Sequence, residues 1–155
     1  MKYVLPLFAL SLLTACGSSI RSGKAMTKKL LDVISNTDVE RAPSVFLPDS
    51  LADSLFECKT ESTKIKAWVE KERQLLISEI NRVPFGLQIE FISTEEKIIK
   101  SYKSGDSFKG CSVLKGFTLI KLKQEFRIKH NEKSEERSKD AAAIKFKGNY
   151  YLIGS

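Results

Sequence analysis

The segment VLKGFTLIKLKQEFRIK, residues 113–129, alternates between apolar and charged side chains over most of its length. Successive side chains of a strand point to opposite faces of a sheet, so this alternation predicts a long strand with one face on a core and one in water. Charged side chains occupy the outer face from Lys121 onward. The inner face holds Leu114, Thr118, Ile120, Leu122, Phe126 and Ile128.

Further alternating runs lie on both sides of this segment. Residues 87–91 alternate in the same way, and a second run near residues 97–102 leads into a glycine-rich loop. Two apolar runs, 141–147 and 150–153, are separated by Gly148-Asn149, which predicts a tight hairpin that closes the sheet. The intervening residues 130–140 are almost entirely charged, and we expect them to form a solvated loop.

Helical periodicity dominates the preceding part of the chain. Residues 24–36 and 62–83 carry apolar side chains three and four positions apart, and Trp68 falls in the apolar stripe of the second helix. Between them, residues 37–40 have the spacing of a capping box, which predicts a short second helix to residue 47 that Pro43 weakens. A further short helix is expected between residues 50 and 58. Helices followed by antiparallel strands indicate an α+β domain with its helices on one face of the sheet.

The N-terminus, MKYVLPLFALSLLTAC, has a positive start and an apolar run too short to span a bilayer, so it is typical of a secretory signal. Its ending, Leu13-Thr14-Ala15-Cys16, resembles the lipobox of bacterial lipoproteins. The resemblance implies that the Cys16 thiol carries a diacylglycerol and that the chain is cut before it. An ordinary cleavage site with an unrelated cysteine is the alternative.

The lipobox also implies the organisation of the chain and its location. We expect a signal peptide over residues 1–15, a lipidated tether over 16–23 and one domain over 24–155. Gly17 replaces the aspartate that retains lipoproteins at the inner membrane. The resemblance therefore implies an outer-membrane lipoprotein with its domain in the periplasm.

Two further cysteines, Cys58 and Cys111, remain in the domain. An even pair in an oxidising compartment predicts a disulfide. In the chain-entropy model, closing a loop of about fifty residues contributes ~4 kcal/mol. A thiol nucleophile or a pair of metal ligands is the alternative.

Two stretches resemble a known superfamily. LLDVISNTDVERAPSVFLPDSL, residues 30–51, resembles the N-terminal helices of NTF2-like domains, and AAAIKFKGNYYLIGS, residues 141–155, resembles their last hairpin. The resemblance implies an NTF2-like/cystatin-like fold, with N-terminal helices packed on one face of a curved antiparallel sheet and a pocket beneath it. Fold alone implies no activity.

Catalytic and metal-binding patterns are not found in the sequence. His130 lies in a charged segment, where a solvated histidine is expected rather than a general base. The aspartates fall at expected turns and helix ends, where capping accounts for them. We therefore expect neither an enzyme, nor a cofactor, nor a metal site.

Positive charge is the strongest remaining signal, because the chain carries 26 Lys and Arg against 19 Asp and Glu. If the strands pair in register, six cations form a stripe in which Glu125 is the only nearby acid. Such a surface could bind anionic lipid headgroups, envelope phosphates or an acidic protein. Lysines on an exposed sheet face also prevent edge-to-edge association, which is the alternative. The six are Lys121, Lys123, Arg127, Lys129, Lys145 and Lys147.

These features predict a lipoprotein with a non-catalytic binding or scaffolding role in the cell envelope, attached to the membrane through its lipid. Nucleic acid is not an expected partner, because no aromatic side chains interleave the cations. The alternatives are a small-molecule-binding or hydrolytic pocket of NTF2-like type, or an immunity-type protein against a periplasmic toxin.

Overall fold

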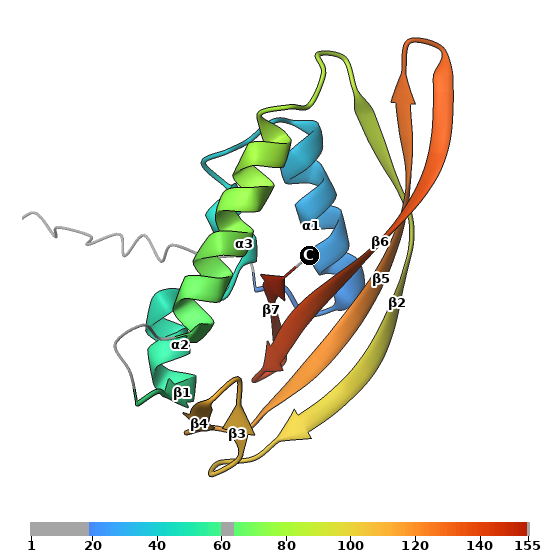
Figure 1. The fold of residues 1–155 in the computed structure, drawn as a ribbon. Helices are drawn as coiled ribbons and strands as arrows, with labels where there is room; N and C mark the ends of the chain where they lie inside the picture. The colour runs from blue at the N-terminus through green and yellow to red at the C-terminus, as the bar shows by residue number, and fades with distance from the viewer. Residues whose placement is uncertain (1–18, 60–63, 155) are drawn as a thin grey trace, which may run out of the picture.

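The computed structural model describes residues 19–59 and 64–154. These residues form three α-helices, one 3-10 helix and two antiparallel sheets, an α+β architecture (Figure 1). The helices are α1 (Gly23–Ser35), η1 (Ala42–Val45), α2 (Asp49–Leu55) and α3 (Lys64–Ile80). The strands are β1 (Phe56–Glu57), β2 (Gln88–Tyr102), β3 (Ser107–Phe108), β4 (Cys111–Val113), β5 (Phe117–His130), β6 (Lys133–Phe146) and β7 (Asn149–Gly154).

The larger sheet has four strands in the order β2-β5-β6-β7, and the smaller sheet has the order β1-β4-β3. Figure 1 shows the three long strands bowed, with α1 and α3 on the side toward which they curve. Helix α1 packs mainly against β2, and α3 packs against the short edge strand β7. The expected arrangement of helices on one face of an antiparallel sheet is therefore confirmed.

The alternation that predicted β5 is confirmed, but the expected loop at residues 130–140 is wrong. Strand β6 begins at Lys133, and only Asn131 and Glu132 form the turn, with φ values of 47° and 61°. The charged side chains of residues 133–140 are compatible with a strand because they form ion pairs with side chains of the neighbouring strand β5. Arg127 donates to Glu136 at 2.6 Å, and Lys121 lies 2.7 Å from Asp140.

Strand β2 is continuous, although the sequence predicted two separate runs. It pairs with β5 along its whole length, with register shifts between Phe91 and Ser93 and between Ile98 and Lys100. Each shift moves the side-chain alternation by one residue. The broken pattern in the sequence therefore marks irregularities within one strand.

The helices largely follow the predicted periodicity. Helix α1 starts one residue earlier than expected, where the Ser22 hydroxyl accepts a hydrogen bond from the Ala25 N–H. The expected second helix reduces to the single 3-10 turn η1, because Thr37 takes a positive φ of 52° and Pro43 lies at its start. Helix α3 is confirmed over most of its predicted length.

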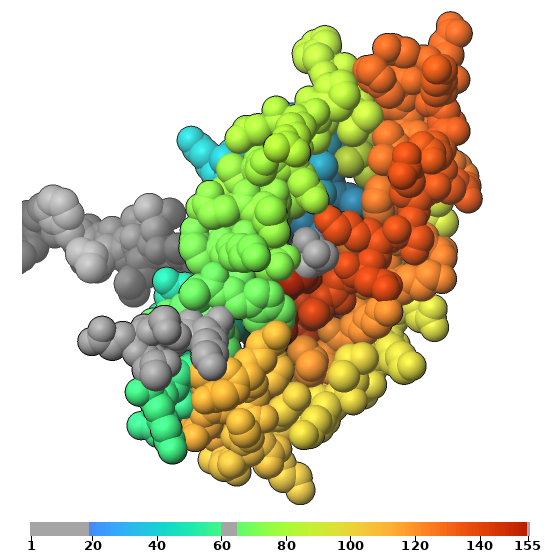
Figure 2. Space-filling model, viewed as in Figure 1, coloured from blue at the N-terminus to red at the C-terminus, as the bar shows by residue number. Residues whose placement is uncertain are grey.

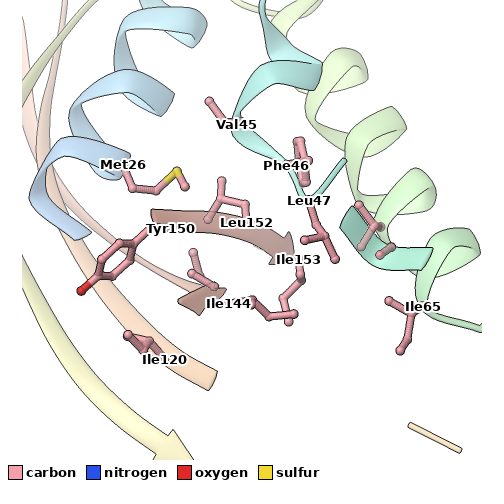
Figure 3. Packing of buried hydrophobic residues seen from close by; sticks show 14 of the residues in the cluster. Met26, Val45, Phe46, Leu47, Ile65, Ile120, Ile144, Tyr150, Leu152 and Ile153 are labelled. Atoms are coloured by element: carbon pink, nitrogen blue, oxygen red, sulfur yellow. The ribbon is translucent and has the colours of Figure 1, made fainter. Parts of the chain in front are cut away.

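The main core lies where β7 meets the helices. Figure 3 shows Leu152 and Ile153 of β7 among Met26 of α1, Leu47 of the loop after η1 and Ile65 of α3. These five side chains are at most 1 % exposed. Trp68, which the sequence placed in the core, is only partly buried, because it lies at the rim of the packing between α3 and β7.

One carboxylate joins three distant segments. Glu96 of β2 accepts hydrogen bonds from the Gly23 N–H at 2.7 Å and from the Tyr150 hydroxyl at 2.8 Å. The approach is close, since a Cβ added at Gly23 would lie 2.6 Å from Leu122. The start of α1, the edge strand β2 and the final strand β7 are therefore fixed to one another.

The predicted disulfide is confirmed. Cys58 is bonded to Cys111 across 53 residues of sequence. Phe56 pairs with Val113 and Glu57 with Ser112, so the bond continues the β1–β4 ladder by one further position. It connects the α2–β1 segment to a cluster of aromatic rings that includes Phe108 and Phe117.

Candidate functional site

A cavity of about 210 Å³ lies between the two long helices and the inner face of the larger sheet. Figure 2 shows the hollow between the upper half of α3, in green, and β6, in red-orange, with α1 in blue behind it. The wall is formed by aliphatic and aromatic side chains from both helices and from three strands, β2, β5 and β7. The helices contribute Leu30, Leu31 and Ile34 of α1 and Leu76 of α3, and the sheet contributes Ile89, Phe126, Ile128 and Leu152. Phe46, Val83 and Leu87 come from the segments between these elements.

The sequence pattern explains why this wall is apolar. Phe126 and Ile128 alternate with the charged residues of β5 and point to the inner face, and Ile89 faces Ile128 across the ladder. Leu76 is 2 % exposed on the inward face of α3. The void remains because the bowed sheet and the two helices diverge toward this end of the molecule (Figure 1).

Two polar pairs border the cavity, and each pair is internally satisfied. The buried Gln124 donates from Nε2 to the Thr27 hydroxyl at 3.1 Å. At the rim, the Lys139 ammonium lies 3.3 Å from a carboxylate oxygen of Glu79, which joins β6 to α3. Because these groups bind one another, the cavity presents mainly hydrocarbon to a ligand.

The six predicted stripe cations do not form one surface. Lys145 pairs with Thr118 in the ladder, whereas Lys121 pairs with Ala142. Cross-strand partners share a face, so Lys145 projects from the inner face and Lys121 from the outer one. Lys147 follows β6 with a positive φ of 48°. Only Lys121, Lys123, Arg127 and Lys129 share the outer face of β5.

The expectation that Glu125 is the only nearby acid is wrong. Lys129 lies 2.5 Å from Glu90, and Arg127 contacts both Glu90 and Glu136. The Lys129 hydrogen bond, with the nearby charges of Lys129 and Arg127, holds the pKa of Glu90 below its usual value. The outer face of β5 is thus a network of alternating charges, and its binding of anions stays a prediction.

A second group of cations was not singled out from the sequence. Lys24 and Lys28 lie four residues apart on one exposed face of α1, and Arg21 is exposed just before the Ser22 N-cap. Lys29 is half-buried beside them and donates to the Ser44 carbonyl at 3.3 Å. None of the four forms an ion pair with another residue that the structure describes. Partial burial, and secondarily the charge of Arg41, lowers the pKa of Lys29.

Lys24 and Lys28 also flank an aromatic ring of β2. Their ammonium groups lie 5.9 and 5.1 Å from the centroid of Phe91. The nearby acid Asp32 is paired with Arg41 at 3.2 Å and accepts a hydrogen bond from Asn36. The outer face of the first half of α1 therefore carries uncompensated positive charge.

The other predicted site residues are distributed as follows. His130 ends β5 at the hairpin tip, beside an open depression that it shares with the loop after α3. Within residues 19–59 and 64–154, no three His, Cys, Asp or Glu side chains are grouped so as to hold a metal ion. Cys16, the predicted lipidation site, lies outside the described residues.

Comparison with known proteins finds no match: no family model, no curated protein and no solved structure is significantly similar to this chain. Among the described residues, no helix is both long enough and apolar enough to cross a bilayer.

Proposed function

We propose that this protein is a lipoprotein of the outer membrane, anchored through Cys16, whose periplasmic domain binds a small apolar ligand without catalysis. The observation that carries the binding role is the cavity between α1, α3 and the sheet, with a wall of hydrocarbon and an opening beside α3. The lipobox sequence supports the anchor. The Cys58–Cys111 bond supports an oxidising compartment.

The domain supports the NTF2-like/cystatin-like assignment in its general arrangement. A long strand pair, β5 and β6, curves toward the side that carries α1 (Figure 1). The lining residues place the pocket between that side of the sheet and the helices. Within that class the same pocket position serves different ligands. The chemistry of this wall, rather than the fold, defines the ligand proposed for it.

The size and wall of the cavity define the class of ligand. An apolar cavity of about 150 Å³ stays dry and accepts benzene, and this cavity measures about 210 Å³. It therefore fits an aromatic ring or a short aliphatic chain. Phe85, between the lining residues Val83 and Leu87 in sequence, is fully exposed.

The polar neighbours favour binding over catalysis. A general base must be free to reach the proton that it abstracts. Glu79 is held by Lys139, and Gln124 is held by Thr27. These pairs orient the wall and close its rim, and they leave the ligand in contact with hydrocarbon.

The test is a titration of the lipidated protein in nanodiscs with 1-hexanol, followed by methyl NMR of Leu30 and Leu76. We expect saturable shifts at both residues. Val83→Trp places an indole at the opening and should abolish them, whereas the control Leu75→Trp, at a position 48 % exposed, should keep them. Shifts that are absent, or that persist in Val83→Trp, would refute ligand binding in this cavity.

A further inference from the structure

We propose that the outer face of the first half of α1, formed by Arg21, Lys24, Lys28 and Lys29, lies against the anionic headgroups of the membrane that holds the anchor. We call this surface the α1 cation face. The inference rests on the lipidation of Cys16 in the proposed function. It is independent of the cavity and of its ligand.

The short connection between the anchor and α1 carries the first part of the argument. The Tyr150 N–H donates to the Ile20 carbonyl at 2.8 Å, which fixes the chain to β7 just before α1 begins. Three residue steps separate Cys16 from Ser19, and an extended chain spans at most about 3.6 Å per residue. Ser19 therefore lies within roughly 11 Å of a lipid-bearing Cys16, and the α1 cation face begins at Arg21.

Charge carries the second part. The electrostatic range in physiological salt is about 8 Å, which is comparable with the tether, so these cations enter the field of an anionic leaflet when this side of the domain lies against the membrane. Each lysine or arginine near such a surface strengthens association about fivefold. Asp32 is neutralised by its ion pair with Arg41, whereas Glu96 keeps its charge but is held toward Gly23 and Tyr150 by their hydrogen bonds.

The stability of the helix does not account for these cations. The N-terminus of a helix carries a partial positive charge and favours acidic side chains. Helix α1 has no acidic residue in its first turn, and Lys24 occupies it instead. The Glu96 carboxylate of β2 supplies that negative charge by accepting from the Gly23 N–H. The exposed lysines form no ion pair with a described residue, so their charge is available to a partner outside the domain.

The apolar part of this face is small, which favours a charged surface over an apolar partner. Phe91 is half-buried between Lys24 and Lys28. A shallow depression on the same side of α1 is lined by Lys28 and Lys29, by the ion pair of Asp32 and Arg41, and by the small or aliphatic Ala25 and Ile20. Headgroup phosphates suit these donors better than hydrocarbon does.

The test measures lysine acetylation by an amine-reactive reagent that does not cross membranes. Lipidated protein is reconstituted into vesicles of phosphatidylethanolamine and phosphatidylglycerol (3:1) or of phosphatidylcholine alone, and reaction rates are read by mass spectrometry. We expect Lys24 and Lys28 to react at least fivefold more slowly on the anionic vesicles, with the difference removed by 0.5 M salt. Lys115 and Lys133, at opposite ends of the molecule (Figure 1), should react equally on both.

A pair of matched variants separates the α1 cation face from the general charge of the protein. Lys29 should be protected on anionic vesicles in the native chain and in Lys121→Gln/Lys123→Gln, but not in Lys24→Gln/Lys28→Gln. Equal rates on both kinds of vesicle, or protection that survives Lys24→Gln/Lys28→Gln, would overturn the inference. A mature chain without lipid on Cys16, seen in the same mass spectra, would instead overturn the anchor of the proposed function.

Discussion

Removal of the Cys58–Cys111 bond should cost the domain a large part of its stability. The bond closes a loop over a sequence separation of 53 residues. In the chain-entropy model, a loop of this length restricts the unfolded state by about 4 kcal/mol. For a domain of this size, the loss corresponds to a fall in melting temperature of roughly 10 to 15 °C.

The assay is urea unfolding of the oxidised native chain, the native chain in reductant, and Cys58→Ala/Cys111→Ala, all in the same detergent. The reduced native chain keeps both sulfur atoms, so its loss isolates the effect of loop closure. The Ala variant should lose slightly more, because Cys111 is 2 % exposed and its replacement leaves a small void.

The location of the bond adds a second expectation. The β1–β4 ladder has only two further residue pairs, and its continuation is the hydrogen bond from the Leu114 N–H to the Leu55 carbonyl at 2.7 Å. Hydrogen exchange in this small sheet should accelerate on reduction before the larger sheet changes. A loss below about 1 kcal/mol in the reduced chain would refute the loop-closure argument for this protein.

Three further predictions concern the junction at Glu96. Gly23→Ala should destabilise the domain by about 1 to 3 kcal/mol in urea unfolding, because its Cβ would lie 2.6 Å from Leu122 and 2.7 Å from Glu96; an unchanged midpoint would contradict this packing. Glu96→Ala should cost about 2 kcal/mol, because the Gly23 N–H and the Tyr150 hydroxyl lose their acceptor; a loss no larger than that of an exposed glutamate on β2 would speak against it. Burial raises the pKa of Tyr150, and the hydrogen bond to Glu96 raises it further. The unfolded state therefore loses this proton first, and stability should fall as the pH rises above about 10. Tyr150→Phe should flatten that fall in a pH series of melting temperatures, and identical profiles would exclude the effect.

The periodicity of apolar residues predicted those helices and strands that bury one face and expose the other. Helix α1 and strand β5 alternate their apolar side chains at the helical and the extended period, so each has one face that must be covered. The disulfide between Cys58 and Cys111 was predicted from the even number of cysteines in the domain and from the oxidising compartment expected for it. These features depend on local sequence or on a count, which a single chain provides.

The N-terminal half of strand β6 was missed because charge was taken as evidence for a loop, whereas its C-terminal half, from Ala141, was predicted. Its N-terminal half is exposed on both faces. It is stabilised by ion pairs with other elements, from Arg127 of the adjacent strand to Glu136 and from Glu79 of α3 to Lys139. The alternation of apolar residues that marks a half-buried strand is absent there. Only the register of the ladder reveals the pairing.

The same register explains the errors about charge. Lys145 and Lys121 are both odd-numbered, but the pairing of Lys121 with Ala142 puts odd residues of β5 opposite even residues of β6. A shift of one residue would have united the predicted stripe. The spacing of Arg21, Lys24 and Lys28 was visible in the sequence, although its proximity to Phe91 was not.

The cavity could not be predicted, since a void depends on how two helices and a curved sheet fit together. The sequence gives the apolar character of Leu76, Phe126 and Ile128, and the same residues could have filled the space. Pattern therefore indicates which faces meet, whereas the fit between those faces defines the candidate site.

Strand β7 has a consequence for the order in which the molecule can acquire its structure. Its backbone binds Ile20 and Leu47, and Tyr150, Leu152 and Ile153 are at most 3 % exposed. A nascent chain that has reached only Gly148 lacks this strand, so α3 lacks the part of the sheet on which it mainly packs. The export that we propose would carry the chain unfolded through a narrow channel, and this topology would delay folding until the last segment has arrived.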